Sequence, residues 1–259
     1  MTSAVTLPVT SARGVVPAFR QFGLLMEWQF RRSAMMMPLL VIIQILLATT
    51  TVFGYGLLIG TPTPLAAAYL ATGASTVTLI MVGLVLTPQQ VSLAKTEGSL
   101  AWLRTLPVPR LVFLAADLTM YTLVALPGTV LGVLVGAWRF GITLSVSPWI
   151  LFAAPLVSFI AAAVGYSSAL LLPPQVAQML SQVLVFVILL FSPISFPADR
   201  MPTWLESVHH WLPIEPLAEL MRATLLSDQF TMPTRSAIVL GGWTLAAVAG
   251  AGAVLRQRT

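Results

Sequence analysis

Residues 95–110 read KTEGSLAWLRTLPVPR and interrupt a long apolar part of the chain. The segment begins with Lys95, the only lysine in the sequence, and no charged residue occurs between Ser33 and Ala94. The apolar stretches on both sides are long enough for helices that cross a bilayer, which needs about 20 residues at 1.5 Å each. We therefore expect residues 95–110 to be a polar connection between membrane spans, where a water-soluble partner can contact the protein.

The composition is typical of a protein that crosses the membrane several times. Of the 259 residues, 58% are hydrophobic and 8% are charged, whereas soluble domains carry about 25% charged residues. The mean hydropathy is +0.93. The sequence contains no cysteine, which excludes disulfides and thiolate metal ligands. The net charge of +5 comes from basic residues between the apolar stretches, so orientation in the membrane explains it and nucleic acid is not an expected partner.

Six apolar stretches are predicted to be transmembrane helices. They comprise residues 34–60, 65–86, 111–137, 147–172, 176–196 and 236–255. Pro62 and Pro64 separate the first two, and Pro173 and Pro174 separate the fourth and fifth, because proline lacks the amide donor and breaks a helix. Backbone groups in lipid must be hydrogen-bonded within their own segment, so the predicted fold class is an all-α membrane protein.

Two further segments are apolar in part but do not fit a span. Residues 15–32 repeat apolar side chains every three or four positions, with arginines on another face, which predicts a helix lying in the membrane interface. Residues 197–233 contain the short apolar stretches 204–212 and 217–226, and we expect these to be re-entrant helices on the external side. The alternative for residues 15–32 is a solvated extension of the first span. The alternative for residues 197–233 is a soluble external cap.

The basic residues predict the orientation of the six spans. One side would carry both termini and Arg13, Arg20, Arg31, Arg32, Lys95, Arg104, Arg110, Arg256 and Arg258. The other side would carry Arg139, Arg200, Arg222 and Arg235. Basic residues accumulate on the cytoplasmic side, so the termini and residues 95–110 are predicted to be cytoplasmic and residues 197–233 external.

The run TEGSLAWLRTLPVPR, residues 96–110, resembles the coupling loop of type-2 ATP-binding-cassette (ABC) exporter permeases. In that family an acid-Gly-small-Leu turn, a short helix and a Thr-Pro-Val-x-Arg exit form the coupling helix. The resemblance implies a cytosolic coupling helix over residues 97–106 that docks on a separate ATPase subunit. The residues that would make or support the docking are Glu97, Gly98, Leu100, Leu103, Pro107 and Arg110.

A second run, SPISFPADRMPTWLESVHHWLPIEPLAELMRATLL over residues 192–226, resembles the external segment of the same family. There, Ser-Pro and Phe-Pro precede a Pro-x-Trp-Leu sequence, a proline-centred turn and a helix ending in arginine. The resemblance implies that this segment forms an external gate. The gate residues would be Pro193, Phe196, Pro197, Trp204, Pro213 and Arg222.

Together the resemblances imply that residues 1–259 form one transmembrane permease domain. Such a subunit exports a hydrophobic or amphipathic substrate across the cell membrane, paired with a second permease copy or a related permease. It is not an enzyme: ATP and Mg would be bound by the partner ATPase, and this chain would bind no cofactor and no metal. A phosphate-binding loop is excluded in this chain, because its only lysine lies between Ala94 and Thr96.

Several polar residues allow more than one interpretation. Asp117 stands where many members of the family have a cation; an acid in a span is a functional candidate, but its place near Arg110 favours a structural role. Gln44 and Gln178 either line a pathway or bond across helices. The pair His209-His210 suggests a metal site, but interfacial histidines are expected, because adjacent helical residues point about 100° apart. Two rival functions remain for the chain. One is a membrane enzyme that uses His209, His210 and external acids, and the other is a permease-like sensor or immunity protein without transport.

Overall fold

The structure is a computed structural model that describes residues 17–35, 37–60, 62–98 and 108–256. In these ranges the regular structure is helical, apart from one isolated bridge between Ser145 and Leu226. The elements in chain order are α1 (Ala18–Ser33), α2 (Met37–Ile59), α3 (Pro64–Met81), η1 (Val82–Leu86), α4 (Thr87–Thr96), α6 (Arg110–Phe140), α7 (Ile150–Leu171), α8 (Pro174–Phe191), η2 (Ala198–Arg200), α9 (Thr203–His209), α10 (Ile214–Leu225) and α11 (Thr234–Arg256).

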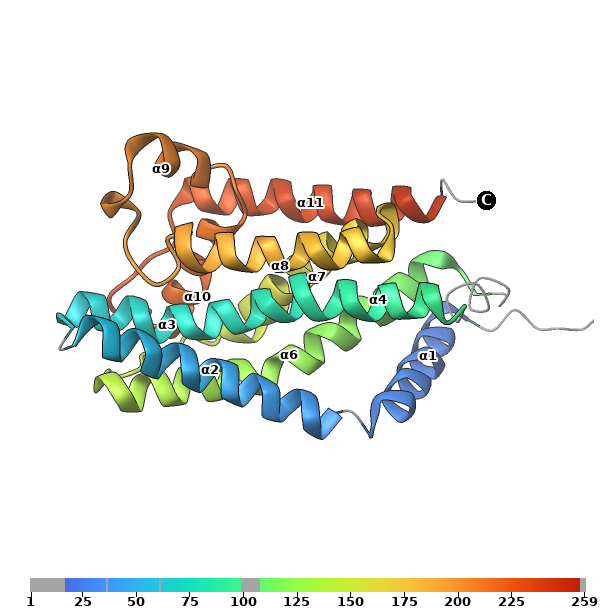
Figure 1. Ribbon diagram of the computed structural model, residues 1–259, viewed down its shortest axis with the longest axis horizontal. Helices are drawn as coiled ribbons and strands as arrows, with labels where there is room; N and C mark the ends of the chain where they lie inside the picture. The colour runs from blue at the N-terminus through green and yellow to red at the C-terminus, as the bar shows by residue number, and fades with distance from the viewer. Residues whose placement is uncertain (1–16, 36, 61, 99–107, 257–259) are drawn as a thin grey trace, which may run out of the picture.

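The long helices run alongside one another in a bundle (Figure 1). Among the described residues, 5 helical segments are long and apolar enough to cross a membrane: Met37–Leu57, Pro64–Thr96, Leu111–Phe140, Ile150–Leu171 and Pro174–Phe191. Each of these segments overlaps one of the first five predicted spans, although their ends differ. Helix α11 covers the sixth and packs against α7 and α10, but the six-span layout itself stays a prediction.

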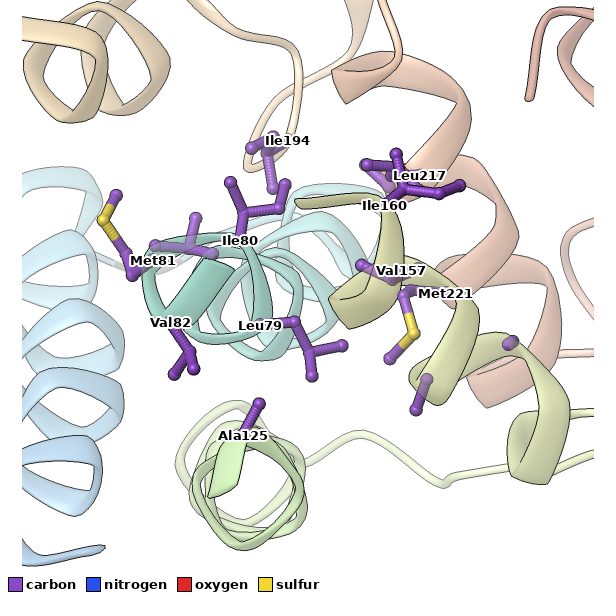
Figure 2. Packing of buried hydrophobic residues seen from close by; sticks show 14 of the residues in the cluster. Leu79, Ile80, Met81, Val82, Ala125, Val157, Ile160, Ile194, Leu217 and Met221 are labelled. Carbon is purple, nitrogen blue, oxygen red and sulfur yellow. The ribbon is translucent and has the colours of Figure 1, made fainter. Parts of the chain in front are cut away.

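Helix α3 lies at the centre of the bundle. In the most apolar window of the segment Pro64–Thr96, 89% of the residues are buried, compared with 17% in the corresponding windows of α2 and α8. The α3–η1 side chains Leu79, Ile80 and Val82 belong to one core cluster with residues of α6, α7 and α10, as Figure 2 shows. Burial on all sides explains why this stretch is apolar without a polar face.

The second span is longer than the sequence predicted. The apolar stretch was predicted to end at Leu86, but the helix continues through η1 and α4 to Thr96. Proline at position 88 has no amide to donate, and the turn before it widens so that the Thr87 amide bonds the Val82 carbonyl. A single π-helical turn thus absorbs the proline without ending the helix, and the polar residues that follow it remain helical.

The two ends of the bundle carry different elements (Figure 1). Helix α1, the end of α4 and the C-terminal end of α11 lie at one end, and α9 and α10 lie at the other. Helix α1 and the C-terminal end of α11 therefore lie at the same end of the bundle.

Helix α1 lies within the segment predicted to be an interfacial helix, and its placement in the membrane interface stays a prediction. Leu25 and Gln29 are buried and the helix packs against α6, whereas Phe19, Leu24 and Phe30 are exposed. An exposed aromatic face beside a membrane bundle is typical of an interfacial helix.

The segment 197–233 contains the short helices α9 and α10, and their placement as external re-entrant helices stays a prediction. Helix α9 is largely exposed, with Trp204 at 67% and Val208 at 48%. In contrast, α10 packs between α3, α7 and α11 and buries Leu217, Met221 and Leu225. Helix α10 is therefore part of the bundle core and not a separate cap.

Candidate functional site

Lys95 connects the end of α4 to the end of α7 through hydrogen bonds. Its ammonium group donates hydrogen bonds to the carbonyls of Leu170 and Leu172, at 3.0 Å each, and to that of Ala169. These carbonyls close α7, where unpaired C=O groups and the negative end of the helix dipole favour a cation. The point at which the 95–110 segment leaves the bundle is thus held at a set position relative to α7.

Glu97 and Gly98 form the turn that ends α4. The Glu97 carboxylate lies 3.5 Å from the guanidinium of Arg32 on α1, and both side chains are about half exposed, so the pair contributes little to stability. Gly98 has φ of 75°, a left-handed conformation that glycine adopts without strain. Glu97 therefore closes α4, and the predicted helix over 97–106 does not begin at this residue.

The structure describes only some of the other predicted coupling residues. Leu100, Leu103 and Pro107 lie outside the described residues, as does most of the predicted coupling helix. Arg110 begins α6. The structure gives the positions of the residues on either side, at the end of α4 and the start of α6.

A cavity of about 250 Å³ lies between α1, α2, the η1–α4 helix, α6 and α7. Asp117 of α6 lines it, and its Oδ1 accepts a hydrogen bond of 2.6 Å from the Gln29 side chain of α1. Asp117 is half-buried. The partner of Asp117 across the helices is a neutral amide, and not the arginine that its place near Arg110 suggested.

Arg222 occupies the opposite end of the bundle. Its guanidinium lies 3.6 Å above the Tyr69 ring and 5.7 Å from the Phe230 ring, and it donates a 3.0 Å hydrogen bond to the carbonyl of Ile194. Burial lowers the pKa of Arg222, while Tyr69 and the nearby acids Glu219 and Glu215 act in the opposite direction. The side chain joins α10, α3 and the loop after α8.

The remaining predicted gate residues differ in their burial. Pro193 is buried, whereas Phe196 and Pro197 are half-buried where the chain enters η2. Pro213 precedes the first turn of α10, and Trp204 projects from α9. The structure therefore brings Pro193 and Arg222 to the core side of the segment but places Trp204 on its outer surface.

The two histidines do not form one site. His209 is buried, with its Nδ1 2.9 Å from the Leu205 carbonyl and its Nε2 3.3 Å from the Ser192 hydroxyl. His210 lies 3.1 Å from Glu215, which also pairs with Arg235 at 3.2 Å. Across the described parts of the chain, no group of three acids or histidines is placed to hold a metal ion. These contacts tie helices together, which is a structural role.

Sequence reasoning missed Gln29 and Tyr69. Gln29 follows Leu25 by four residues, a spacing that places both on one helical face, so its burial beside a span could have been inferred. Tyr69 gave no such signal, because the sequence pattern of an apolar span does not distinguish an aromatic residue that faces lipid from one that faces a buried arginine.

The helices and their ends define a membrane protein with several apolar helices. The family model for ABC-2 type transporters matches residues 20–226, which include α1, five membrane-length helices and the α9–α10 segment. The chain belongs to the ABC-2 type transporter family, as the two sequence runs predicted, and is the permease component of an ABC transporter. No curated protein sequence matches the chain.

Proposed function

We propose that this chain is the membrane-spanning permease subunit of an ABC exporter that moves a hydrophobic or amphipathic substrate out of the cell. The family match over residues 20–226 is the observation that carries the proposal. ATP and Mg are bound and ATP is hydrolysed by a separate cytosolic ATPase subunit, and this chain binds neither cofactor nor metal. Two permease copies, identical or related, form the pathway.

Residues 95–110 are the docking segment for the ATPase in this proposal. The segment leaves a continuous helix that runs from Pro64 to Thr96 through the core, so a displacement at its end is transmitted along the most buried element. The Lys95 contact carries the same displacement to α7, and the Arg32–Glu97 contact carries it to α1.

The protein lies in the cell membrane with six crossings and with both termini in the cytoplasm. The distribution of basic residues supports this orientation. The position of α1, the α4 end and the α11 end at one end of the bundle is compatible with it (Figure 1).

The α9–α10 segment is the external gate. Arg222 connects α10 to the Ile194 carbonyl and stacks on Tyr69 of α3. Helix α3 belongs to the same continuous helix that ends beside the docking segment. A movement that begins at the ATPase can therefore reach the gate through one helix and one buried side chain.

The test is purification of the tagged full chain in mild detergent, from cells that also express its genomic neighbours, with identification of any ATPase that accompanies it. Glu97→Lys is expected to lower the amount of co-purified ATPase about tenfold, which corresponds to ~1.4 kcal/mol. Asp199→Lys is the matched control, since it makes the same charge change on the exposed η2 at the other end.

The outcomes separate the rival interpretations. If the Glu97→Lys variant retains the ATPase at the level of the control, residues 95–110 are not the docking segment. If no ATPase accompanies the unaltered chain, transport driven by a separate ATPase is wrong and the sensor or immunity interpretation takes its place.

A further inference from the structure

The cavity beside Asp117 is polar at one part of its wall and apolar at another. Asp117, Gln29 and Arg32 supply the polar part. Leu40, Met120 and Val124, from α2 and α6, supply an apolar part. A ligand that fits such a wall carries a polar head and an apolar body.

The polar part of the wall combines a guanidinium with a carboxyl group. Arg32, Asp117 and Tyr121 all line the cavity. A carboxylate has about four acceptor positions, so the Gln29 amide and the neighbouring Tyr166 hydroxyl leave capacity for a further donor. Arg32 is about half exposed and its present partner Glu97 is 3.5 Å away, so it can also receive a phosphate.

The size of the cavity limits what can enter it. Pockets that enclose a drug-sized molecule measure about 300–1,000 Å³, and this cavity measures about 250 Å³. It therefore accommodates a polar head group and the first part of an attached apolar chain, with the rest of that chain outside.

The position of the cavity favours a lipid as the source of that head group. One wall is α1, which exposes Phe19 and Phe30 as an interfacial helix does. The aromatic residue Trp28 of the same helix lines the cavity, and tryptophan is enriched at the level of lipid head groups. The cavity thus lies where head groups and the first methylene groups of a bilayer are expected.

We propose that this cavity binds the head group of a zwitterionic amine phospholipid, with its ammonium at Asp117, its phosphate at Arg32 and its first methylene groups along Leu40 and Met120. The site needs a protein embedded in a bilayer, which the family and the apolar helices show. It does not depend on the partner ATPase, on the cargo or on the direction of transport.

The experiment measures binding of short-chain phosphatidylethanolamine to the purified full chain in detergent, by native mass spectrometry, with short-chain phosphatidylglycerol as the lipid without an amine. Phosphatidylethanolamine is expected to bind and phosphatidylglycerol to bind at least about tenfold more weakly, because a charge-assisted hydrogen bond is lost. Equal binding of the two lipids would overturn the proposal, and this comparison needs no variant.

Two variants locate the site. Asp117→Asn keeps the shape of the side chain and is expected to weaken phosphatidylethanolamine binding about tenfold, with Asp199→Asn on exposed η2 as the control. Leu40→Trp keeps both charges and fills the apolar part, and is expected to abolish binding. Unchanged affinity in a folded Asp117→Asn or Leu40→Trp protein would refute this site, whether or not the ATPase experiment succeeds.

Discussion

At the residue scale, one glutamine bonds to a turn of α6 that a proline distorts. Pro127 lies inside α6, where a proline removes a backbone hydrogen bond and distorts the turn before it. The Gln44 side chain of α2 donates to the Val124 carbonyl at 2.6 Å and accepts from the Gly128 amide at 3.0 Å. The single buried side-chain amide of Gln44 therefore provides hydrogen-bond partners for one donor and one acceptor of the distorted turn. Lipid chains cannot provide such partners.

Replacing this amide should be costly. Gln44→Leu has a similar volume but leaves the Val124 carbonyl and the Gly128 amide without that partner, and we expect it to lower the free energy of unfolding by about 1–3 kcal/mol. Equilibrium unfolding in mixed micelles measures this change. The control is Thr51→Val on the same helix, whose hydroxyl bonds only the Leu47 carbonyl at an exposed position. Equal stability of the two variants would show that Gln44 does not repair the turn.

The sequence singled out the polar residues inside apolar stretches whose contacts the structure then gives. Gln44 was left between lining a pathway and bonding across helices, and its contacts select the second. A structural role was favoured for Asp117, and its hydrogen bond to Gln29 is compatible with that role. The identity of the partner could not be deduced, because Gln29 lies 88 positions away in sequence and only the packing of α1 on α6 brings it near.

At the element scale, the π-helical turn of η1 lies against α7 with almost no space between the backbones. A methyl group added at Gly165 would lie 2.1 Å from the Gly83 carbonyl oxygen, and one added at Gly83 would lie 2.4 Å from the backbone of Ala161. Small residues allow such close approach in membrane bundles. The two glycines thus fix the spacing between the central helix and α7 where the second span widens.

This contact gives a prediction with an internal control. Gly165→Ala must push α7 away from η1, and we expect a loss of about 1–3 kcal/mol in unfolding free energy, as for other overpacked cores. Gly241→Ala on α11 meets nothing within 4 Å and is expected to be neutral or slightly stabilising, since alanine favours helix over glycine. The same unfolding measurement serves both variants. A Gly165→Ala protein as stable as the Gly241→Ala protein would contradict the close packing.

The lengths of the elements were predictable to different degrees. Apolar stretches and paired prolines located the first five spans. Apolar side chains are favoured in the hydrocarbon core, and prolines interrupt the helices that cross it. The predicted end of the second span was wrong. Residues 87–92 look like a polar loop in sequence, whereas α4 buries Val91 and Ser92 against the bundle. Burial of polar residues by tertiary contacts is not visible in a hydropathy pattern.

At the scale of the whole molecule, two outer helices remain largely uncovered. Only 17% of the most apolar window is buried in both α2 and α8, and large apolar side chains such as Leu46 and Phe186 are exposed there. Soluble monomers rarely expose apolar areas of this extent. Lipid or a second permease copy is expected to cover both faces, in keeping with the proposed pair of permeases.

The orientation of the chain can be tested directly, because the sequence has no cysteine and each introduced thiol is the only one. Asp199→Cys and Asp228→Cys, both at exposed positions, should react with a membrane-impermeant maleimide in intact cells. Glu97→Cys, at the exposed end of α4, should react only after the cells are permeabilised. The reverse pattern would invert the proposed topology and would place residues 95–110 out of reach of a cytosolic ATPase.

A fourth position decides between five and six crossings. Helix α11 has 23 residues, or about 34 Å at 1.5 Å per residue, enough to cross a hydrocarbon core of about 30 Å. If it crosses, Thr259→Cys will be labelled only after permeabilisation, like Glu97→Cys. If it stays on the outer side, Thr259→Cys will be labelled in intact cells, like Asp228→Cys. The first result is expected, since Arg256 and Arg258 follow the apolar stretch and basic residues at the end of a span favour the cytoplasm.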